Sequence, residues 1–133
     1  MITEIHPLTG LRLLLVEDEA MVAMMVEDML SELGCIVVDV AGTVSRGVAL
    51  ADDASLQLDG ALLDVNLGGD KVYPVAEALA ARGVPFIFST GYGTTGITAR
   101  FTHVPILAKP YQLDLLEEKL MVALRPRPRS ELS

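Results

Sequence analysis

Polar residues with complementary chemistry stand directly after four apolar runs of this chain, where the strands of a sheet would end. They are the acidic run Glu17, Asp18 and Glu19, then Asp64, Thr90 and Lys109. Because the carboxyl ends of parallel strands meet at one edge of a sheet, we expect these side chains to lie close together. The sequence therefore predicts a site that combines several carboxylates with one hydroxyl and one ammonium group.

Carboxylates crowded in this way suit a hard divalent cation. Neighbouring carboxylates resist ionising together, and a cation that takes oxygen ligands removes their repulsion. Magnesium binds through one or two carboxylates, keeps several waters and can also take a phosphate oxygen. Asp64 can then attack phosphorus, because carboxylates form phosphoryl intermediates. The charge of Lys109 and the hydroxyl of Thr90 would stabilise the transferring group.

Each of these residues also has an ordinary structural interpretation. Asp18 and Glu19 suit the start of a helix, where acidic side chains interact favourably with the helix dipole. Thr90 alone is a common turn residue, and Lys109 alone is a common surface residue. Asp64 is harder to explain in this way, since it follows an apolar strand and has no evident capping role. The occurrence of all these residues at four strand ends favours a functional site.

The segments that must position these residues alternate between two types. Five short apolar runs predict buried strands, at 11–16, 35–41, 61–65, 84–89 and 104–108. Five other segments predict helices, at 19–33, 43–53, 70–82, from 94 or 95 to 101, and 112–124. Thr43 can cap the second helix, and Gly34 and Gly83 follow the ends of the first and third. This alternation indicates an α/β fold with a parallel sheet covered on both faces.

Length and composition limit the possible classes of protein. The 133 residues suit one compact domain, and an apolar fraction of 51% excludes a disordered chain. No apolar run approaches the ~20 residues of a membrane helix. Eighteen acidic and ten basic residues give a net charge of −8, which argues against direct binding to nucleic acid. A single cysteine, Cys35, excludes an internal disulfide and fits a reducing cytoplasm.

The charge is uneven along the chain. Residues 125–133 hold three arginines and one glutamate, together with two prolines that a helix would not accommodate. We therefore expect one domain at 8–124, followed by a flexible C-terminal tail at 125–133.

With its strand-end residues in this order, the chain resembles the receiver domains of two-component response regulators, from about 11 to 124. The resemblance implies a flavodoxin-like, doubly wound, five-stranded parallel sheet with strand order 2-1-3-4-5 and five helices. It also implies a phosphorelay receiver that takes its phosphoryl group from a sensor histidine kinase or a histidine phosphotransfer protein. Such a receiver is not an enzyme for other substrates, and it catalyses only its own phosphorylation and dephosphorylation.

The resemblance gives each reacting residue a role. Asp64 corresponds to the aspartate that accepts the phosphoryl group. Thr90 corresponds to the hydroxyl that turns toward the new phosphate, and Lys109 to the lysine that forms a salt bridge with it. The peptide bond between Lys109 and Pro110 is expected to be cis, as in similar proteins.

The cofactor implied by the resemblance is Mg2+. Asp18 is the expected direct ligand beside the phosphoacceptor Asp64, and Glu17 is expected to act through a water molecule. Asn66, two residues after the phosphoacceptor, would contribute its backbone carbonyl.

Two features set this chain apart from common receivers. Ile106 stands three positions before the lysine, where many receivers carry an aromatic switch residue. The stretches 66–69 and 88–93 resemble a subgroup with a Phe-small-Thr-Gly-hydrophobic-aromatic loop, whose members are often stand-alone or stress-signalling receivers. We hypothesise that Tyr92 or Tyr111 takes over the switching role of the missing aromatic residue.

Seven consecutive apolar residues, 20–26, begin the first predicted helix. A helix that lies on a sheet buries only one stripe, so some of these residues, which include three methionines, must face solvent. The resemblance implies that the phosphohistidine donor docks on this helix, while the alternative is that the methionines only fill gaps in the core. Because no output domain is expected, the output would come from a downstream protein partner. The resemblance also admits a homodimer through the face formed by helix four, strand five and helix five.

Three other functions are compatible with parts of the sequence. A small haloacid-dehalogenase-like phosphatase also uses an aspartyl nucleophile, a lysine and magnesium, but it would carry a second aspartate where this chain has Asn66. A degenerate receiver would act only as a protein-binding module, which the complete set of site residues argues against. The segment 91–96 matches the G-x-G-x-x-G dinucleotide fingerprint. It lies in the fourth strand–helix unit, however, and the next strand ends in Lys109 rather than in an acidic residue.

Overall fold

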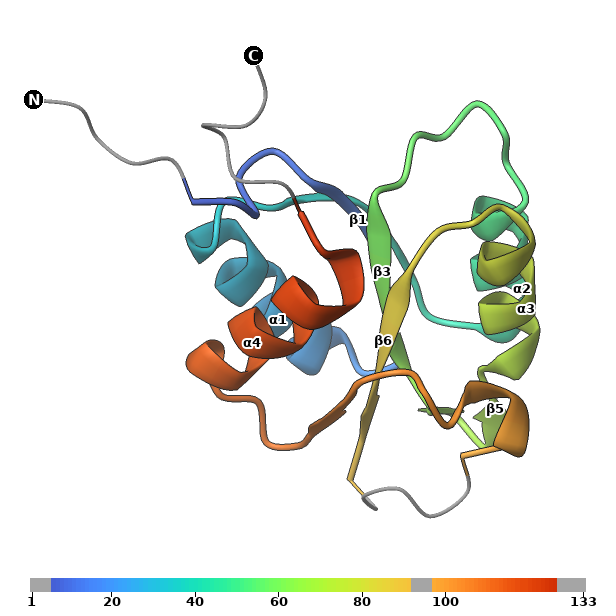
Figure 1. Cartoon of the computed structure of the whole chain (residues 1–133). Helices are drawn as coiled ribbons and strands as arrows, with labels where there is room; N and C mark the ends of the chain where they lie inside the picture. Colours follow the sequence, from blue (N-terminus) through green and yellow to red (C-terminus); the bar gives the residue numbers. More distant parts are fainter. Residues whose placement is uncertain (1–5, 92–96, 127–133) are drawn as a thin grey trace, which may run out of the picture.

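A parallel sheet of five strands forms the centre of the computed structural model, which describes residues 6–91 and 97–126 (Figure 1). The strand order is β2-β1-β3-β6-β7, so the predicted order 2-1-3-4-5 is confirmed. The strands are β1 (Arg12–Val16), β2 (Ile36–Ala41), β3 (Gly60–Asp64), β6 (Phe86–Thr90) and β7 (Ile106–Ala108). Their bounds agree with the predicted ones to within two residues. The last two strands start later than predicted, at the residues that follow Pro85 and Pro105, which cannot donate to a strand ladder.

Alternating side chains of the strands divide the apolar core into two layers. Leu13 and Leu15 of β1 pack with α1 (Ala20–Glu32) and α4 (Leu113–Leu124). Leu14 and Val16 point to the other face, toward α2 (Val44–Ala51) and α3 (Tyr73–Ala81). Figure 1 shows the same arrangement, with α1 and α4 on one side of the sheet and α2 and α3 on the other. The predicted doubly wound architecture follows from this two-residue period.

Helix α1 confirms that part of its apolar run faces solvent. Ala23 and Val26 are buried, whereas Met21, Met24 and Met25 are 84%, 64% and 42% exposed. The methionines thus form an outward apolar surface on a helix whose opposite face is anchored in the core.

Within the described part of the chain, no helix is long and apolar enough to cross a membrane.

The predicted third helix at 70–82 starts three residues too early. Asn66–Leu67 (β4) and Asp70–Lys71 (β5) pair as a short antiparallel hairpin, and α3 begins only at Tyr73. Gly68 and Gly69 have φ values of 56° and 96°, which a two-residue hairpin turn requires and which glycine adopts without strain. The two glycines therefore fix a hairpin where helix propensity suggested the first helical turn.

The predicted fourth helix is also wrong within the described residues. Only a 3-10 turn, η1 (Ala99–Phe101), is present there, and Thr98 before it is extended. Residues 92–96, which include the predicted helix start and most of the G-x-G-x-x-G segment, lie outside the described residues. The described chain therefore has four α-helices instead of the predicted five. Ile97 and Thr98 are β-branched and weak helix formers, whereas buried Phe101 packs against Phe86 and fixes the turn.

Gly34, immediately after α1, provides a test of the fold. Its φ is +90°, and an added Cβ would lie 2.7 Å from Thr9 Oγ1 and 3.0 Å from Thr9 Cα. We expect Gly34→Ala to lower the free energy of unfolding by at least about 1–2 kcal/mol, the cost of a left-handed conformation alone. Urea denaturation measures this difference. Gly42→Ala is the matched control, because its Cβ would meet nothing closer than 3.8 Å, and an equal loss there would contradict the assignment.

Candidate functional site

The register of the strands brings the predicted site residues to one edge of the sheet. Asp64 pairs with Ser89 across β3 and β6, and Thr90 pairs with Ala108 across β6 and β7. The Lys109 amide donates a hydrogen bond to the Thr90 carbonyl at 3.1 Å. Three separate segments therefore converge where β3, β6 and β7 end.

Lys109 joins two buried carboxylates at this edge. Its Nζ lies 2.9 Å from Asp64 Oδ2 and 3.2 Å from Glu17 Oε1. The side chains of Asp64 and Glu17 are only 6% and 1% exposed, and that of Lys109 is 24% exposed. A buried carboxylate is costly unless it is paired, so this bridge is what allows both acids to occupy the edge of the core.

Burial and the neighbouring charges shift the pKa values of Glu17 and Lys109. Burial raises the pKa of Glu17 from 4.5 to about 7, with the negative charge of Asp64 acting in the same direction. Hydrogen bonds from the Glu19 amide and from Lys109 act against this rise. Burial alone would lower the pKa of Lys109, but the hydrogen bond to Asp64 and the neighbouring negative groups outweigh it, so the pKa is raised. Lys109 is therefore a permanent cation beside Asp64 at neutral pH.

The acidic run after β1 presents oxygen ligands close together. One carboxylate oxygen from each of Glu17, Asp18 and Glu19 lies within 4.8 Å of the others. Asp18 is exposed, and its Oδ2 accepts a hydrogen bond from the Gly68 amide at 2.9 Å. A set made only of carboxylate oxygens, partly open to solvent, fits a hard cation such as Mg2+ and not a softer metal. Glu19 was not among the predicted ligands, although it belongs to the same acidic run.

The β4–β5 hairpin contacts Asp64 in a way that the sequence did not predict. The Asn66 amide donates to Asp64 Oδ1 at 3.2 Å, and Lys71 Nζ donates to Asn66 Oδ1 at 2.6 Å. With the bond from Gly68 to Asp18, the hairpin contacts both the acidic run and Asp64. The Gly-Gly pair at 68–69 was the signal that could have predicted this turn.

The residues around the predicted switch are partly described. Thr90 is buried, at 2% exposure, and Ile106 of β7 pairs with Phe88, two residues before Thr90 on β6. Tyr111 Oη donates a hydrogen bond to Ser89 Oγ at 2.7 Å, and burial raises the pKa of its phenol to about 12. Tyr92, the other candidate aromatic, lies outside the described residues. The bond between Lys109 and Pro110 is cis, as predicted.

No protein-family model and no curated protein matches this chain, but solved structures do. The solution structure of SdrG from Sphingomonas melonis Fr1 is 45% identical over 90% of this chain and 98% of that one, with a TM-score of 0.73. A signal receiver domain of a modulated diguanylate cyclase from Desulfovibrio desulfuricans G20 is 30% identical over 87% and 94%, with a TM-score of 0.75. The chain belongs to the response regulator receiver domains.

A third similar structure concerns the metal site of receivers. The receiver domain of the sensor histidine kinase PA1611 from Pseudomonas aeruginosa PAO1 was solved with a magnesium ion coordinated in its active-site cleft. It is 26% identical to this receiver over 88% of this chain and 99% of that one, with a TM-score of 0.74. Membership of the receiver family places this chain among signalling proteins and not among the dehalogenase-like phosphatases or the dinucleotide-binding enzymes.

The shifted pKa of Glu17 gives a measurable pH dependence. In metal-free receiver, its side-chain carboxyl should titrate near pH 7, as followed by carbon-13 NMR. Because folding raises this pKa from 4.5, the contribution of Glu17 to stability is complete below pH 4.5 and decreases as the pH rises through about 7. Asp64→Asn removes a nearby negative charge and should lower the midpoint. A midpoint near 4.5 in the wild type, or a rise in the variant, would contradict this electrostatic account.

Proposed function

We propose that this receiver accepts a phosphoryl group on Asp64. The observation that carries the proposal is the contact of the buried Asp64 carboxylate with the Lys109 ammonium, next to the acidic run after β1. A carboxylate at the carboxyl end of a strand, with a fixed cation beside it, is an oxygen nucleophile in a site prepared for added negative charge.

In the proposed reaction, an Asp64 oxygen forms a bond to phosphorus while the phosphorus–nitrogen bond of a phosphohistidine breaks. Lys109 is already in place to pair with the oxygens of the transferred group, and Thr90 stands at the end of the adjacent strand. Asp18, Asp64 and the Asn66 carbonyl would hold Mg2+, with Glu17 acting through water. The ion, when bound, would neutralise charge on the phosphoryl oxygens.

Incubation of the receiver with magnesium and acetyl phosphate, followed by intact-mass measurement, tests the proposal. Wild type should gain one phosphoryl group, and Asp64→Asn should gain none. Asp70→Asn, an exposed aspartate in the adjacent hairpin, is the control and should be phosphorylated like the wild type. Chelation of the metal should abolish the gain in every variant. An unmodified wild type would instead support a degenerate receiver that only binds proteins.

We further propose that the phosphoryl donor is a histidine kinase or a histidine phosphotransfer protein that docks on the methionines of α1. These side chains are exposed on the face of α1 opposite to the one that packs in the core. Methionine adapts well to apolar partner surfaces. Their position at the start of α1 directly follows the acidic run, so a docked donor would lie beside the site.

The triple change Met21→Gln, Met24→Gln and Met25→Gln should slow transfer from a phosphohistidine donor by about tenfold or more. Loss of two or three buried apolar contacts of ~1 kcal/mol each accounts for this size. The rate with acetyl phosphate should not change, because the small donor needs no docking surface. Ile36→Gln, at an exposed position on β2, serves as control. Equal slowing with both donors would point to damage of the fold and not to docking.

For the output, we propose that Tyr111 couples the site to the surface of α4. Its hydroxyl bonds to Ser89, which precedes Thr90, and Tyr111 leads directly into α4. Tyr111→Phe removes this hydrogen bond and keeps the ring, so the amide NMR shifts that phosphorylation causes in α4 should become smaller. Tyr73→Phe provides the comparison, because this ring packs beneath the opposite face of the sheet. Unchanged shifts in Tyr111→Phe and in Tyr92→Ala would show that neither tyrosine takes over the switching role of the missing aromatic residue.

Four further expectations belong to the proposal, and they concern the domain bounds, the cellular location, a downstream partner and a homodimer. The domain comprises 8–124, followed by a tail at 125–133, and α4 ends at Leu124 as this division requires. A cytoplasmic location fits the single buried thiol of Cys35. A downstream protein partner and a homodimer would both use the face formed by η1, β7 and α4.

A further inference from the structure

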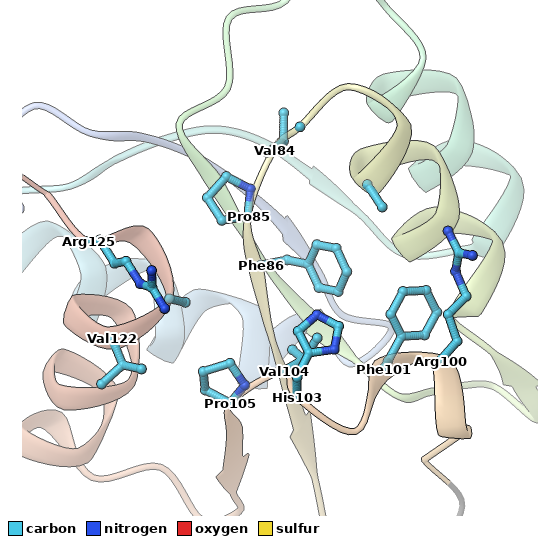
Figure 2. Close-up of a pocket in the computed structure, with 13 residues that line it drawn as sticks. Val84, Pro85, Phe86, Arg100, Phe101, His103, Val104, Pro105, Val122 and Arg125 are labelled. Atoms are coloured by element: carbon cyan, nitrogen blue, oxygen red, sulfur yellow. The ribbon is translucent and has the colours of Figure 1, made fainter.

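A pocket of about 580 Å³ opens at the end of the sheet opposite to Asp64 (Figure 2). Residues 84–86 at the start of β6 and 104–105 before β7 form its floor. Thr90 lies at the other end of β6, four residues from Phe86, which corresponds to roughly 13 Å along a strand. The pocket is therefore distinct from the phosphoacceptor site.

The inside of the pocket is apolar. Phe86, Phe101 and Val104 contribute buried side chains, and the rings of Phe86 and Phe101 lie 5.7 Å apart. Val122 of α4 forms another wall and is 56% exposed. A volume of this size, lined by aromatic and aliphatic groups with a few polar groups at the rim, is typical of sites for small organic molecules.

The rim carries positive charge in a chain whose net charge is −8. Arg100 and Arg125 lie on opposite sides of Phe86 in Figure 2, and no acidic side chain lines the described pocket. Arg100 is compensated by an ion pair with Glu77 at 2.9 Å, and its guanidinium lies over the Phe101 ring. Arg125, by contrast, makes no side-chain hydrogen bond or ion pair with any residue that the structure describes.

The backbone of Arg125 provides a second observation. It follows α4 in a left-handed conformation with φ 44°, and it is the only non-glycine residue with positive φ in the described chain. Glycine or asparagine is favoured at such a helix end, because other side chains are strained there. An arginine in this strained position points to a use for its side chain.

We propose that this pocket binds a small organic monoanion with an aromatic body, of the aromatic carboxylate class. The ring would lie against Phe86, Phe101 and Val104, and the carboxylate would pair with Arg125 at the rim. One uncompensated arginine matches one carboxylate. The chain's own segment 127–133 carries further arginines and so has the same sign of charge as the pocket.

Amide NMR titration of the nitrogen-15-labelled full chain tests the proposal with benzoate, 2-naphthoate and indole-3-acetate as probes. At least one should shift the amides of Phe86, Val104 and Arg125 with a Kd of about 1 mM or tighter, as a ligand of this size achieves. The neutral amide of the same probe should bind at least about fivefold more weakly, since it lacks the charge-assisted hydrogen bond. Failure of all three acids, or equal binding of the neutral amide, would overturn the proposal.

Variants separate ligand binding from the fold and from phosphorylation. Arg125→Gln should weaken binding by about fivefold or more, whereas Arg46→Gln, at an exposed ion pair on α2, should not. Arg125→Gly should raise the thermal midpoint by relieving the backbone, and still weaken binding. Asp64→Asn should bind the probe like the wild type, so the test does not depend on the proposed phosphorylation. Undiminished binding by both Arg125 variants would contradict the assignment.

Discussion

One ammonium group between two buried carboxylates is the interaction on which the site depends. Without Lys109, Asp64 and Glu17 would be two negative charges at the edge of an apolar core, each raising the cost of the other. With it, Asp64 is held next to a cation at the end of β3, and Glu17 contacts the same ammonium group from the end of β1. The three groups stand at the ends of three different strands, β1, β3 and β7, so the sheet must be complete before the charges are compensated. Folding of the sheet and compensation of these buried charges are thus the same event in this receiver.

Much of the fold could be predicted because its elements carry independent signals. The apolar strands, the stop at Gly34 and the cap at Thr43, whose hydroxyl accepts from the Arg46 amide, all follow from local chemistry. Chain connectivity then places the ends of parallel strands at one edge, which is why Asp64 and Lys109 could be expected to meet. The prediction succeeded where each segment's own preference agreed with its place in the sheet.

The errors lie where a tertiary contact or a turn overrides segment composition. Residues 70–72 have no helix-breaking sequence of their own, and only the preceding glycine pair turns them into a hairpin. Likewise, Phe101 is fixed by aromatic neighbours from β6 and α3 that are distant in sequence. The partnership of Asn66 with Lys71, and of Tyr111 with Ser89, depends on side-chain reach in three dimensions. No spacing rule along the chain encodes such contacts.

The solvent-facing thioethers of α1 have a consequence for signalling fidelity. Unbranched, polarizable side chains can repack against differently shaped partners, so a surface made of them discriminates poorly between partners of similar shape. Selectivity would then have to come from charged groups around the rim, or from keeping competing donors scarce. As the proposed docking surface for donors, these side chains would suit convergence, in which several upstream sensors feed one common response.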